Sequence, residues 1–189
     1  MRIITGQARG RRLETLPGLD TRPTAERVKE ALFSALQFEI EGRRVLDLFA
    51  GSGQMGIEAL SRGAQGCVFV DSNREAVEVI RRNLKAVGLT ANTQVLCQDA
   101  ASYLTRHSDR FDIAFLDPPY AAGLLEDSLR QVVPFMNPGG VIACESDRTL
   151  TLPDRVGDFA LARVYPYGRV RIWLYRYDNG AVQQTEKSE

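Results

Sequence analysis

The chain has 189 residues, which is enough for one domain with a sizeable core and a small extension. Hydrophobic residues make up 44% of it and charged residues 25%, as in an ordinary globular protein. The sequence contains no run of about 18 apolar residues, so no membrane-spanning helix is predicted. Its 24 basic and 24 acidic residues cancel, so the overall charge identifies no partner.

The first 22 residues predict a small N-terminal extension. Residues 2–6 and 10–15 resemble two short strands around a Gly/Arg-rich turn, which indicates a β-hairpin. Pro17-Gly18 and Arg22-Pro23 then interrupt regular structure. Residues 1–29 carry seven basic and three acidic side chains, so this end is basic although the whole chain is neutral.

A helix is predicted next, with Thr24 as its N-cap and Arg27 at its third position. Apolar residues spaced four apart, from Val28 to Ile40, would form its buried stripe. Gly42 is expected to end this helix.

Strands and helices then alternate along the chain. The predicted strands are residues 45–49, 66–71, 94–97, 111–117 and 141–145, and the predicted helices are residues 54–62, 73–87, 100–107 and 124–136. A Pro-Gly-Gly turn at residues 138–140 is expected before the fifth strand. Helices between consecutive strands imply right-handed crossovers and a parallel sheet that is covered on both faces.

The C-terminal part departs from this alternation. Residues 159–164 and 170–177 are strand-like runs with no room for a helix between them, so they must pair antiparallel. We therefore predict an α/β, Rossmann-like fold with a seven-stranded, mainly parallel, doubly wound sheet that ends in an antiparallel hairpin. Residues 179–189 are polar and are expected to form a frayed tail.

Cysteine and histidine usage predicts a cytoplasmic protein without a metal. Cys67, Cys97 and Cys144 lie in apolar, strand-like runs, and none belongs to a CxxC pair. With one histidine, His107, in the chain, the cysteines are expected to be reduced core residues. The N-terminus shows no apolar segment typical of a secretion signal.

The segment that joins the first long strand to its helix is rich in glycine: Gly51, Gly53 and Gly56 follow Asp47. Glycines let the backbone turn tightly at a helix N-terminus and approach a ligand closely. The spacing fits the GxGxxG pattern, and Asp71 ends the next strand, where it is placed to accept hydrogen bonds from ribose hydroxyls. This loop alone is compatible with a dinucleotide such as NAD or with S-adenosylmethionine (SAM).

Three features favour SAM. Asp47 precedes the glycines, where its charge would repel a pyrophosphate but attract an ammonium and a sulfonium. Asp99 and the N–H of Ala100 follow the third strand and could bind an adenine edge, and Asp117 ends the fourth strand beside them. Asp99 could instead cap the next helix, and Asp71 could act only as a charge near a helix N-terminus. The predicted cofactor site comprises Asp47, Phe49, Ala50, Gly51, Ser52, Gly53, Asp71, Asp99 and Ala100.

The fourth strand ends in Asp117-Pro118-Pro119-Tyr120. Two prolines cannot continue a central strand, so the chain must leave the sheet at Asp117, at the edge where open α/β sheets bind ligands. The stiff backbone would present the Asp117 carboxylate, the Pro118 carbonyl and the Tyr120 ring to a flat heterocycle with an exocyclic NH2. Without the rest of the chain, a proline-terminated strand explains this motif more simply.

These motifs resemble those of the RsmD family of class I SAM-dependent methyltransferases. The resemblance rests on DLFAGSG at 47–53, FVD at 69–71 and FLDPPY at 115–120, and on the N-terminal blocks TRPT at 21–24 and RVKEALF at 27–33. It extends from residue 2 to about residue 176. Met55 stands where Ala is expected, which is tolerable because the glycines around it are intact.

The resemblance implies methylation of the exocyclic N2 of a guanine in 16S rRNA, with SAM as donor and S-adenosylhomocysteine as product. It implies a methyltransferase domain over residues 23–178, preceded by an RNA-contacting hairpin extension over residues 1–22. The expected partner is 16S rRNA within a small-subunit assembly intermediate, and we expect a monomer.

The catalytic residues implied by the resemblance are Asp117, Pro118, Pro119 and Tyr120. Asp117 and the Pro118 carbonyl would accept both N2 hydrogens and make the amine more nucleophilic, without first removing a proton, because an ordinary carboxylate is too weak a base. Tyr120 would stack on a base splayed out of the RNA. The residues expected to contact RNA are Arg2, Arg9, Arg11, Arg12, Arg22, Thr24 and Arg27, and the last three could instead lie near the SAM carboxylate.

Other activities remain as alternatives. DNA adenine-N6 methyltransferases share the D-P-P-Y logic, but usually carry a separate target-recognition domain for which 189 residues leave no space. A protein-glutamine methyltransferase would more usually have Asn in place of Asp117. A dehydrogenase would need a hydride-transfer site, and a non-enzymatic nucleotide-binding module would not need Asp117 or Tyr120.

Overall fold

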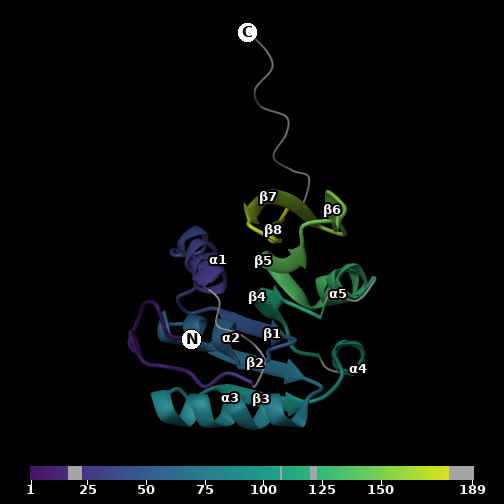
Figure 1. Ribbon diagram of the computed structural model, residues 1–189. Helices are drawn as coiled ribbons and strands as arrows, with labels where there is room; N and C mark the ends of the chain where they lie inside the picture. Colours follow the sequence, from purple (N-terminus) through teal and green to yellow (C-terminus); the bar gives the residue numbers. More distant parts are fainter. Residues whose placement is uncertain (17–22, 107, 120–122, 179–189) are drawn as a thin grey trace.

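An eight-stranded sheet forms the centre of the structure, a computed structural model that describes residues 1–16, 23–106, 108–119 and 123–178, with the backbone alone over residues 23–25 (Figure 1). The strands are β1 Arg44–Leu48, β2 Gly66–Asp71, β3 Thr93–Cys97, β4 Phe111–Leu116, β5 Met136–Asp147, β6 Arg155–Val156, β7 Phe159–Tyr167 and β8 Val170–Tyr177. Their order across the sheet is β3-β2-β1-β4-β5-β8-β7-β6. The first five run parallel, and β8, β7 and β6 join through antiparallel pairs, as the predicted fold requires.

Helices cover both faces of the sheet (Figure 1). They are α1 Pro23–Ala35, α2 Gln54–Ser61, α3 Arg74–Val87, α4 Ala100–Leu104 and α5 Leu124–Val132, the last followed by a 3₁₀ turn, η1, at Val133–Phe135. One hydrophobic cluster joins α1, α2, α3 and the N-terminal segment to one face of the sheet, and a second joins α4 and α5 to the other. Within the described ranges, no helix is long and apolar enough to cross a membrane.

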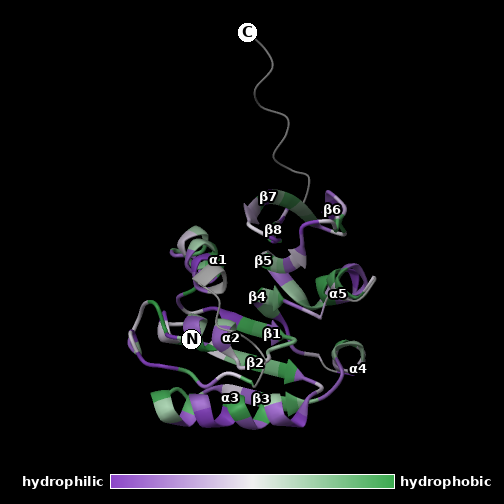
Figure 2. Ribbon diagram, viewed as in Figure 1, coloured by the Kyte–Doolittle hydropathy of each residue, from purple (hydrophilic) through white to green (hydrophobic). Residues whose placement is uncertain are grey.

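Successive strand residues alternate between the two clusters because β side chains point to opposite faces. Val45 packs in the first cluster and Leu46 in the second, and Ile113 and Ala114 divide in the same way. Figure 2 shows the result as apolar central strands and a mixture of apolar and polar residues on α3. The apolar runs of the sequence are therefore strands buried on both faces, as expected of a parallel sheet.

The C-terminal half of the sheet differs from the prediction in two places. The sheet has eight strands rather than the predicted seven. The additional strand is β6, which was not predicted because its two residues are too few to form a sequence pattern. Residues 138–140 do not form a turn before β5; they lie within it, at an irregularity where the register with β4 shifts. Gly139, with φ +76°, bends the strand without ending it.

The first helix starts and ends earlier than predicted. It begins at Pro23, so Thr24 lies in the first turn rather than at the N-cap; proline suits this position because its φ is preset and its missing N–H would have no helical partner. The helix ends at Ala35, and residues 36–39 form a turn. Leu36 and Ile40 are nevertheless fully buried, so the apolar spacing marked core positions beyond the helix end.

The three cysteines are free, but only two of them are core residues. Cys67 and Cys144 are buried, whereas Cys97 is exposed because β3 is an edge strand. His107 lies outside the described residues. In the described part of the chain, no group of three or more His, Cys, Asp or Glu side chains is placed to hold a metal ion.

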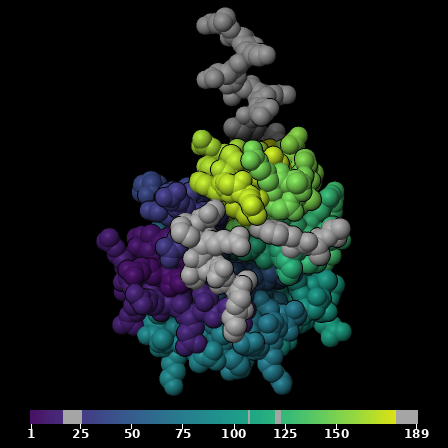
Figure 3. Space-filling view, in the orientation of Figure 1, coloured from purple at the N-terminus to yellow at the C-terminus, as the bar shows by residue number. Residues whose placement is uncertain are grey.

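The predicted N-terminal hairpin is reduced to one antiparallel bridge, between Arg2 and Arg12. Glu58 of α2 is fully buried and accepts the backbone N–H groups of Ile4 at 2.8 Å and Thr5 at 3.0 Å. Figure 3 shows this segment, in purple, as one flank of the molecule. Three of its apolar side chains belong to the first hydrophobic cluster: Ile3, Ala8 and Leu13.

Candidate active site

A cavity of about 920 Å³ opens at the carboxyl edge of the parallel strands. It lies where the strand order reverses, between β1 and β4, which is the usual ligand position in open α/β sheets. Eleven of the predicted site residues line it: Asp47, Phe49, Ala50, Gly51, Ser52, Asp71, Asp99, Ala100, Asp117, Pro118 and Pro119. The fold thus brings together most of the residues predicted for cofactor and catalysis.

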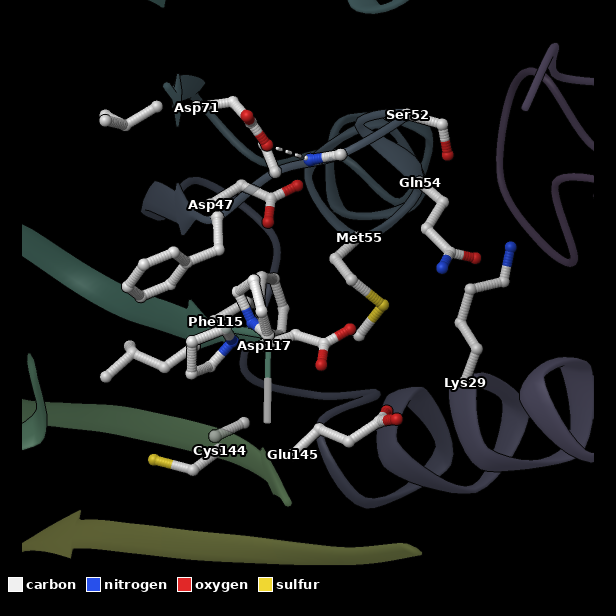
Figure 4. A pocket seen from close by; sticks show the side chains of 18 of the residues that line it. Lys29, Asp47, Ser52, Gln54, Met55, Asp71, Phe115, Asp117, Cys144 and Glu145 are labelled. Atoms are coloured by element: carbon white, nitrogen blue, oxygen red, sulfur yellow. Dashed lines mark hydrogen bonds between the residues drawn. The ribbon is translucent and has the colours of Figure 1, made fainter. Parts of the chain in front are cut away.

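The glycine-rich loop is held by the end of β2. The N–H groups of Phe49 and Ala50 both donate to the Val70 carbonyl at 3.0 Å. The Asp71 carboxylate accepts the N–H of Gly51 at 2.8 Å (dashed line in Figure 4). At Gly51 the space where a side chain would begin is open, and φ is +55°. A ligand can therefore approach the backbone at this point.

The other two glycines of the pattern serve packing. A Cβ on Gly56 would lie 2.3 Å from the Phe69 ring, so only glycine allows α2 to pack this closely on β2. Gly53 is buried, forms the N-cap of α2 and is not part of the cavity lining. Its contribution to the predicted cofactor site is the shape of the loop.

Phe49 has a left-handed backbone conformation, with φ +69°, which is rare for a bulky residue. Such a conformation costs on the order of 1–3 kcal/mol and persists only where surrounding contacts enforce it. Here the hydrogen bond to the Val70 carbonyl and the packing of the half-buried ring against the second cluster enforce it. Strain of this kind is concentrated at functional sites, and this loop is one candidate.

Asp47 is buried beneath the loop and is 3% exposed. Its carboxylate accepts the N–H of Gly56 at 2.8 Å. Burial raises the pKa of Asp47 to about 7, although the Gly56 N–H lowers it, and the charge of Asp71 raises it further. A cation in the cavity would favour the charged form of Asp47, so this position suits a cationic ligand.

Asp71 and Asp99 combine structural hydrogen bonds with access to the cavity. Asp71 also accepts the N–H of Asn73 at 2.8 Å. Asp99 is the N-cap of α4 and accepts the N–H of Ser102 at 3.0 Å. Both side chains line the cavity, so the capping role and the ligand role considered from the sequence are compatible.

Asp117 directly follows β4 and is exposed to the open cavity. Protein atoms nevertheless surround it closely, and this loss of hydration, followed by the charges of Glu145 and Asp47, raises its pKa well above the usual range. Pro118 is buried and Pro119 is exposed, and both line the cavity. Figure 4 shows the Asp117 side chain pointing into the same space as Met55 and Glu145.

Several predicted residues lie elsewhere. Tyr120, Arg22 and the Thr24 side chain are outside the description of the structure. Arg27 is exposed on α1 and does not line the cavity. The four predicted arginines of the N-terminal segment are exposed and also lie outside the lining: Arg2, Arg9, Arg11 and Arg12.

Both ends of the N-terminal segment nevertheless reach the cavity, because Met1, Thr15 and Leu16 line it. One arginine of the segment is engaged with the protein itself: Arg11 donates to the Ala86 carbonyl at 2.9 Å. The basic segment therefore borders the cavity, but the side chains of Arg2, Arg9, Arg11 and Arg12 do not line it.

Three charged lining residues were not identified from the sequence: Lys29, Glu145 and Arg169. Lys29 is 2% exposed, donates to the Arg2 carbonyl at 2.8 Å and lies 3.4 Å from the Glu58 carboxylate. Burial lowers the pKa of Lys29, and Glu58 opposes this shift. In the sequence, the burial of Lys29 is indicated only by its position next to Val28, in the apolar stripe of the predicted helix.

The cavity matches a cationic ligand with several hydrogen-bond donors. Among the described residues, five carboxylates line it against two basic side chains. The amide oxygen of Gln54, also in the lining, is buried and has no hydrogen-bond partner among the described residues. Buried acceptors are rarely left unpaired, so a ligand donor would satisfy it. Together with the open approach at Gly51, these features fit SAM, whose sulfonium and ammonium groups are cationic.

Comparison with known proteins identifies the family. The family described as "Conserved hypothetical protein 95" matches residues 1–176. Ribosomal RNA small subunit methyltransferase D of Escherichia coli is 35% identical over 178 residues, covering 93% of this chain and 89% of that protein. The solved structure of yhhF from Escherichia coli matches with a TM-score of 0.83 at 36% identity, covering 94% of this chain and 98% of that one.

A further solved structure is informative about ligands. The T. thermophilus 16S rRNA guanine-N2 methyltransferase RsmC, in complex with AdoMet and guanosine, matches with a TM-score of 0.69 at 26% identity. The match covers 86% of this chain and 45% of RsmC. The chain belongs to the RsmD family of rRNA methyltransferases, which confirms the family and the α/β fold predicted from its motifs.

Proposed function

We propose that this protein transfers the methyl group of SAM to the exocyclic N2 of a guanine in 16S rRNA. The observation that carries the proposal is the position of Asp117 and Pro118, which line the same cavity as the glycine-rich loop. Methyl transfer to an amine needs the amine and the donor held together, and this arrangement provides acceptors for the amine beside a candidate cofactor site. The guanosine and AdoMet bound by RsmC support the same pairing of ligands.

The cofactor would occupy the loop and the ends of β1, β2 and β3. Asp71 would accept ribose hydroxyls, and Asp99 with the Ala100 N–H would bind the adenine edge. Asp47 would face the cationic end of the cofactor, where its negative charge is favourable. When bound, SAM supplies a methyl group on a positively charged sulfur.

The target amine would be held by acceptors on the segment after β4. The Asp117 carboxylate and the Pro118 carbonyl would accept the two N2 hydrogens, which favours a more tetrahedral and more nucleophilic nitrogen. Tyr120 would stack on the base after it leaves its RNA helix or loop. These groups act by orientation and electrostatics, and no covalent enzyme intermediate is needed.

The RNA itself would be bound outside the cavity. The exposed arginines Arg2, Arg9 and Arg12 lie on a segment whose ends reach the cavity, so their charges would meet phosphates next to the splayed base. Arg22 and Arg27 would extend this surface. We propose that a monomer acts on 16S rRNA in a partly assembled small subunit.

One experiment distinguishes this substrate from its alternatives. Purified protein is given labelled SAM with duplex DNA, free 16S rRNA or immature small subunits, and the labelled nucleoside is identified by mass spectrometry. Label in N2-methylguanosine of 16S rRNA is the expected result. Label found only in DNA, as N6-methyladenine, would replace the proposal with the DNA-methyltransferase alternative.

A further inference from the structure

A second carboxylate, Glu145, lies beside Asp117 in the cavity. Leu116 of β4 is in register with Cys144 of β5, so the next residues, Asp117 just beyond the end of β4 and Glu145 on β5, are adjacent. Side chains in register point to the same face of a sheet. Both residues line the cavity, and Figure 4 shows both side chains directed into it.

The backbone of Glu145 is firmly held. β5 pairs with β4 up to Cys144 and with β8 up to Asp147, and Glu145 itself is opposite Ile172, which is buried. A carboxylate on a central strand keeps its position better than one on a loop, as a group that reads a ligand edge must. Asp117, fixed by the prolines that follow it, is similarly restrained.

The charges of these neighbours favour hydrogen-bond donors between them. Two carboxylates in one site repel each other, and the charge of Glu145 contributes to the raised pKa of Asp117. A neutral ligand that offers adjacent N–H groups would relieve this repulsion by donating to both. A ligand with a lone pair at either position would add to it.

Guanine and adenine differ at this edge. Guanine presents two neighbouring donors, N1–H and the N2 amine, whereas adenine presents an unprotonated N1 next to its amine. A carboxylate can accept from N1–H of guanine but only repels the lone pair on N1 of adenine, because an ionised carboxylate has no proton to donate. An ionised carboxylate opposite N1 is therefore complementary to guanine and opposed to adenine.

We propose that Glu145 selects guanine by accepting its N1–H while Asp117 and the Pro118 carbonyl accept the N2 hydrogens. The inference rests on the proposed function and adds a specificity residue to it.

The test compares two target bases in the same rRNA fragment, guanine and 2-aminopurine, which keeps the N2 amine but lacks N1–H. The quantity measured is the ratio of kcat/KM for guanine to kcat/KM for 2-aminopurine, in the wild type and in Glu145→Gln. A glutamine can turn its amide to donate to an unprotonated N1, so we expect this ratio to fall roughly 10- to 100-fold in Glu145→Gln. Glu78→Gln, on the exposed face of α3, is the matched control and should leave the ratio unchanged.

Two results would overturn the inference. One is a Glu145→Gln variant that slows both substrates by the same factor, or slows neither. The other is a loss of SAM affinity in Glu145→Gln that is large enough to explain the whole change in kcat/KM. That result would indicate that Glu145 binds the cofactor rather than the base. If the wild type forms no N2-methylguanine at all, the proposed function fails as well; if it does and the ratio stays constant, only the role of Glu145 fails.

Discussion

Asp47 couples the candidate cofactor site to stability. An unfolded aspartate ionises near pH 3.9, whereas folded Asp47 keeps its proton up to about pH 7 because it is buried. Between these values the folded state binds more protons than the unfolded state, so the free energy of unfolding falls as pH rises from about 4 to 7. Above about pH 7, the buried and ionised carboxylate of Asp47 therefore lowers the stability of the folded protein, beneath the loop of the candidate cofactor site.

Removing this charge should stabilise the protein without ligand. Asp47→Asn keeps an oxygen for the Gly56 N–H, and we expect it to raise the free energy of unfolding at pH 8 by roughly 2–4 kcal/mol, with little effect at pH 4. Urea unfolding at the two pH values measures this. The exposed substitution Asp154→Asn is the control, and an Asp47→Asn variant that is no more stable than wild type at pH 8 would refute the explanation.

At the residue scale, the sequence predicted the site residues that directly follow a strand. It did not predict those that reach the site only because of how strands and helices pack together. Asp71, Asp99 and Asp117 could be selected because each ends or closely follows an apolar run. Glu145 also ends such a run, but its importance comes from the pairing of β5 with β4, which sequence order alone does not fix. Lys29 reaches the cavity only because α1 packs across that face.

The N-terminal segment and α2 form one unit through Glu58. This buried carboxylate accepts two backbone N–H groups of the segment and the Nε of Arg62 at 2.9 Å, and lies 3.4 Å from Lys29. Removing one partner of a buried ion pair leaves the other uncompensated, which is more costly than losing an exposed pair. The attachment of the segment to the body therefore depends strongly on one side chain.

Glu58→Gln should lower the free energy of unfolding by about 3–5 kcal/mol, because Lys29 loses its counter-charge and the new NH2 group opposes a backbone donor. Hydrogen exchange at the amides of Ile4 and Thr5 should accelerate more than exchange in β4. The exposed pair on α3 provides the control: Glu78→Gln should change stability by less than about 1 kcal/mol. Unchanged exchange at both amides in Glu58→Gln would contradict this role.

At the element scale, local signals predicted α3 well, because Asn73 caps its start and Gly88 its end. They failed where tertiary packing decides. Residues 138–140 contain strong turn signals, yet pairing with β4 at Met136 and Val141, on either side of them, keeps them within a strand. β6 exists only because β7 offers it an edge, so no pattern of its own could identify it.

The whole molecule is electrically neutral but has a basic N-terminal flank. If that flank binds phosphates, replacing two of its exposed arginines should weaken RNA binding regardless of sequence. For Arg9→Gln with Arg12→Gln, we expect the slope of log K for RNA against log salt to decrease in magnitude by about 1.5, since each phosphate contact contributes about 0.7–0.9. The Kd for SAM should not change.

A matched control is available on the opposite face of the sheet, where α4 packs. Arg106 is exposed after α4, on the chain that returns to the amino end of β4, away from the cavity. Arg106→Gln should leave both the salt slope and the affinity unchanged. An equal effect of Arg106→Gln and the N-terminal pair would indicate diffuse attraction instead of a defined RNA surface.

At this scale, the alternation of strands and helices predicted a doubly wound sheet and the acidic strand ends predicted a shared site. The strand order β3-β2-β1-β4-β5 then explains why the site is single: Asp47, Asp99 and Asp117, far apart in the sequence, lie at or just beyond the carboxyl ends of β1, β3 and β4, on one edge of the sheet. The order itself follows from packing of the crossover helices on two faces, which a list of elements does not specify.

The central claim is that Asp117 holds the amine that is methylated. The most direct test measures N2-methylguanosine formed in 16S rRNA by Asp117→Ala at saturating SAM, with the Kd for SAM measured in parallel and Asp154→Ala as control. We expect methylation to fall by about 100-fold or more, as when a transition-state hydrogen-bonding group is removed, while the Kd for SAM changes little. Full formation of N2-methylguanosine by Asp117→Ala would contradict the claim.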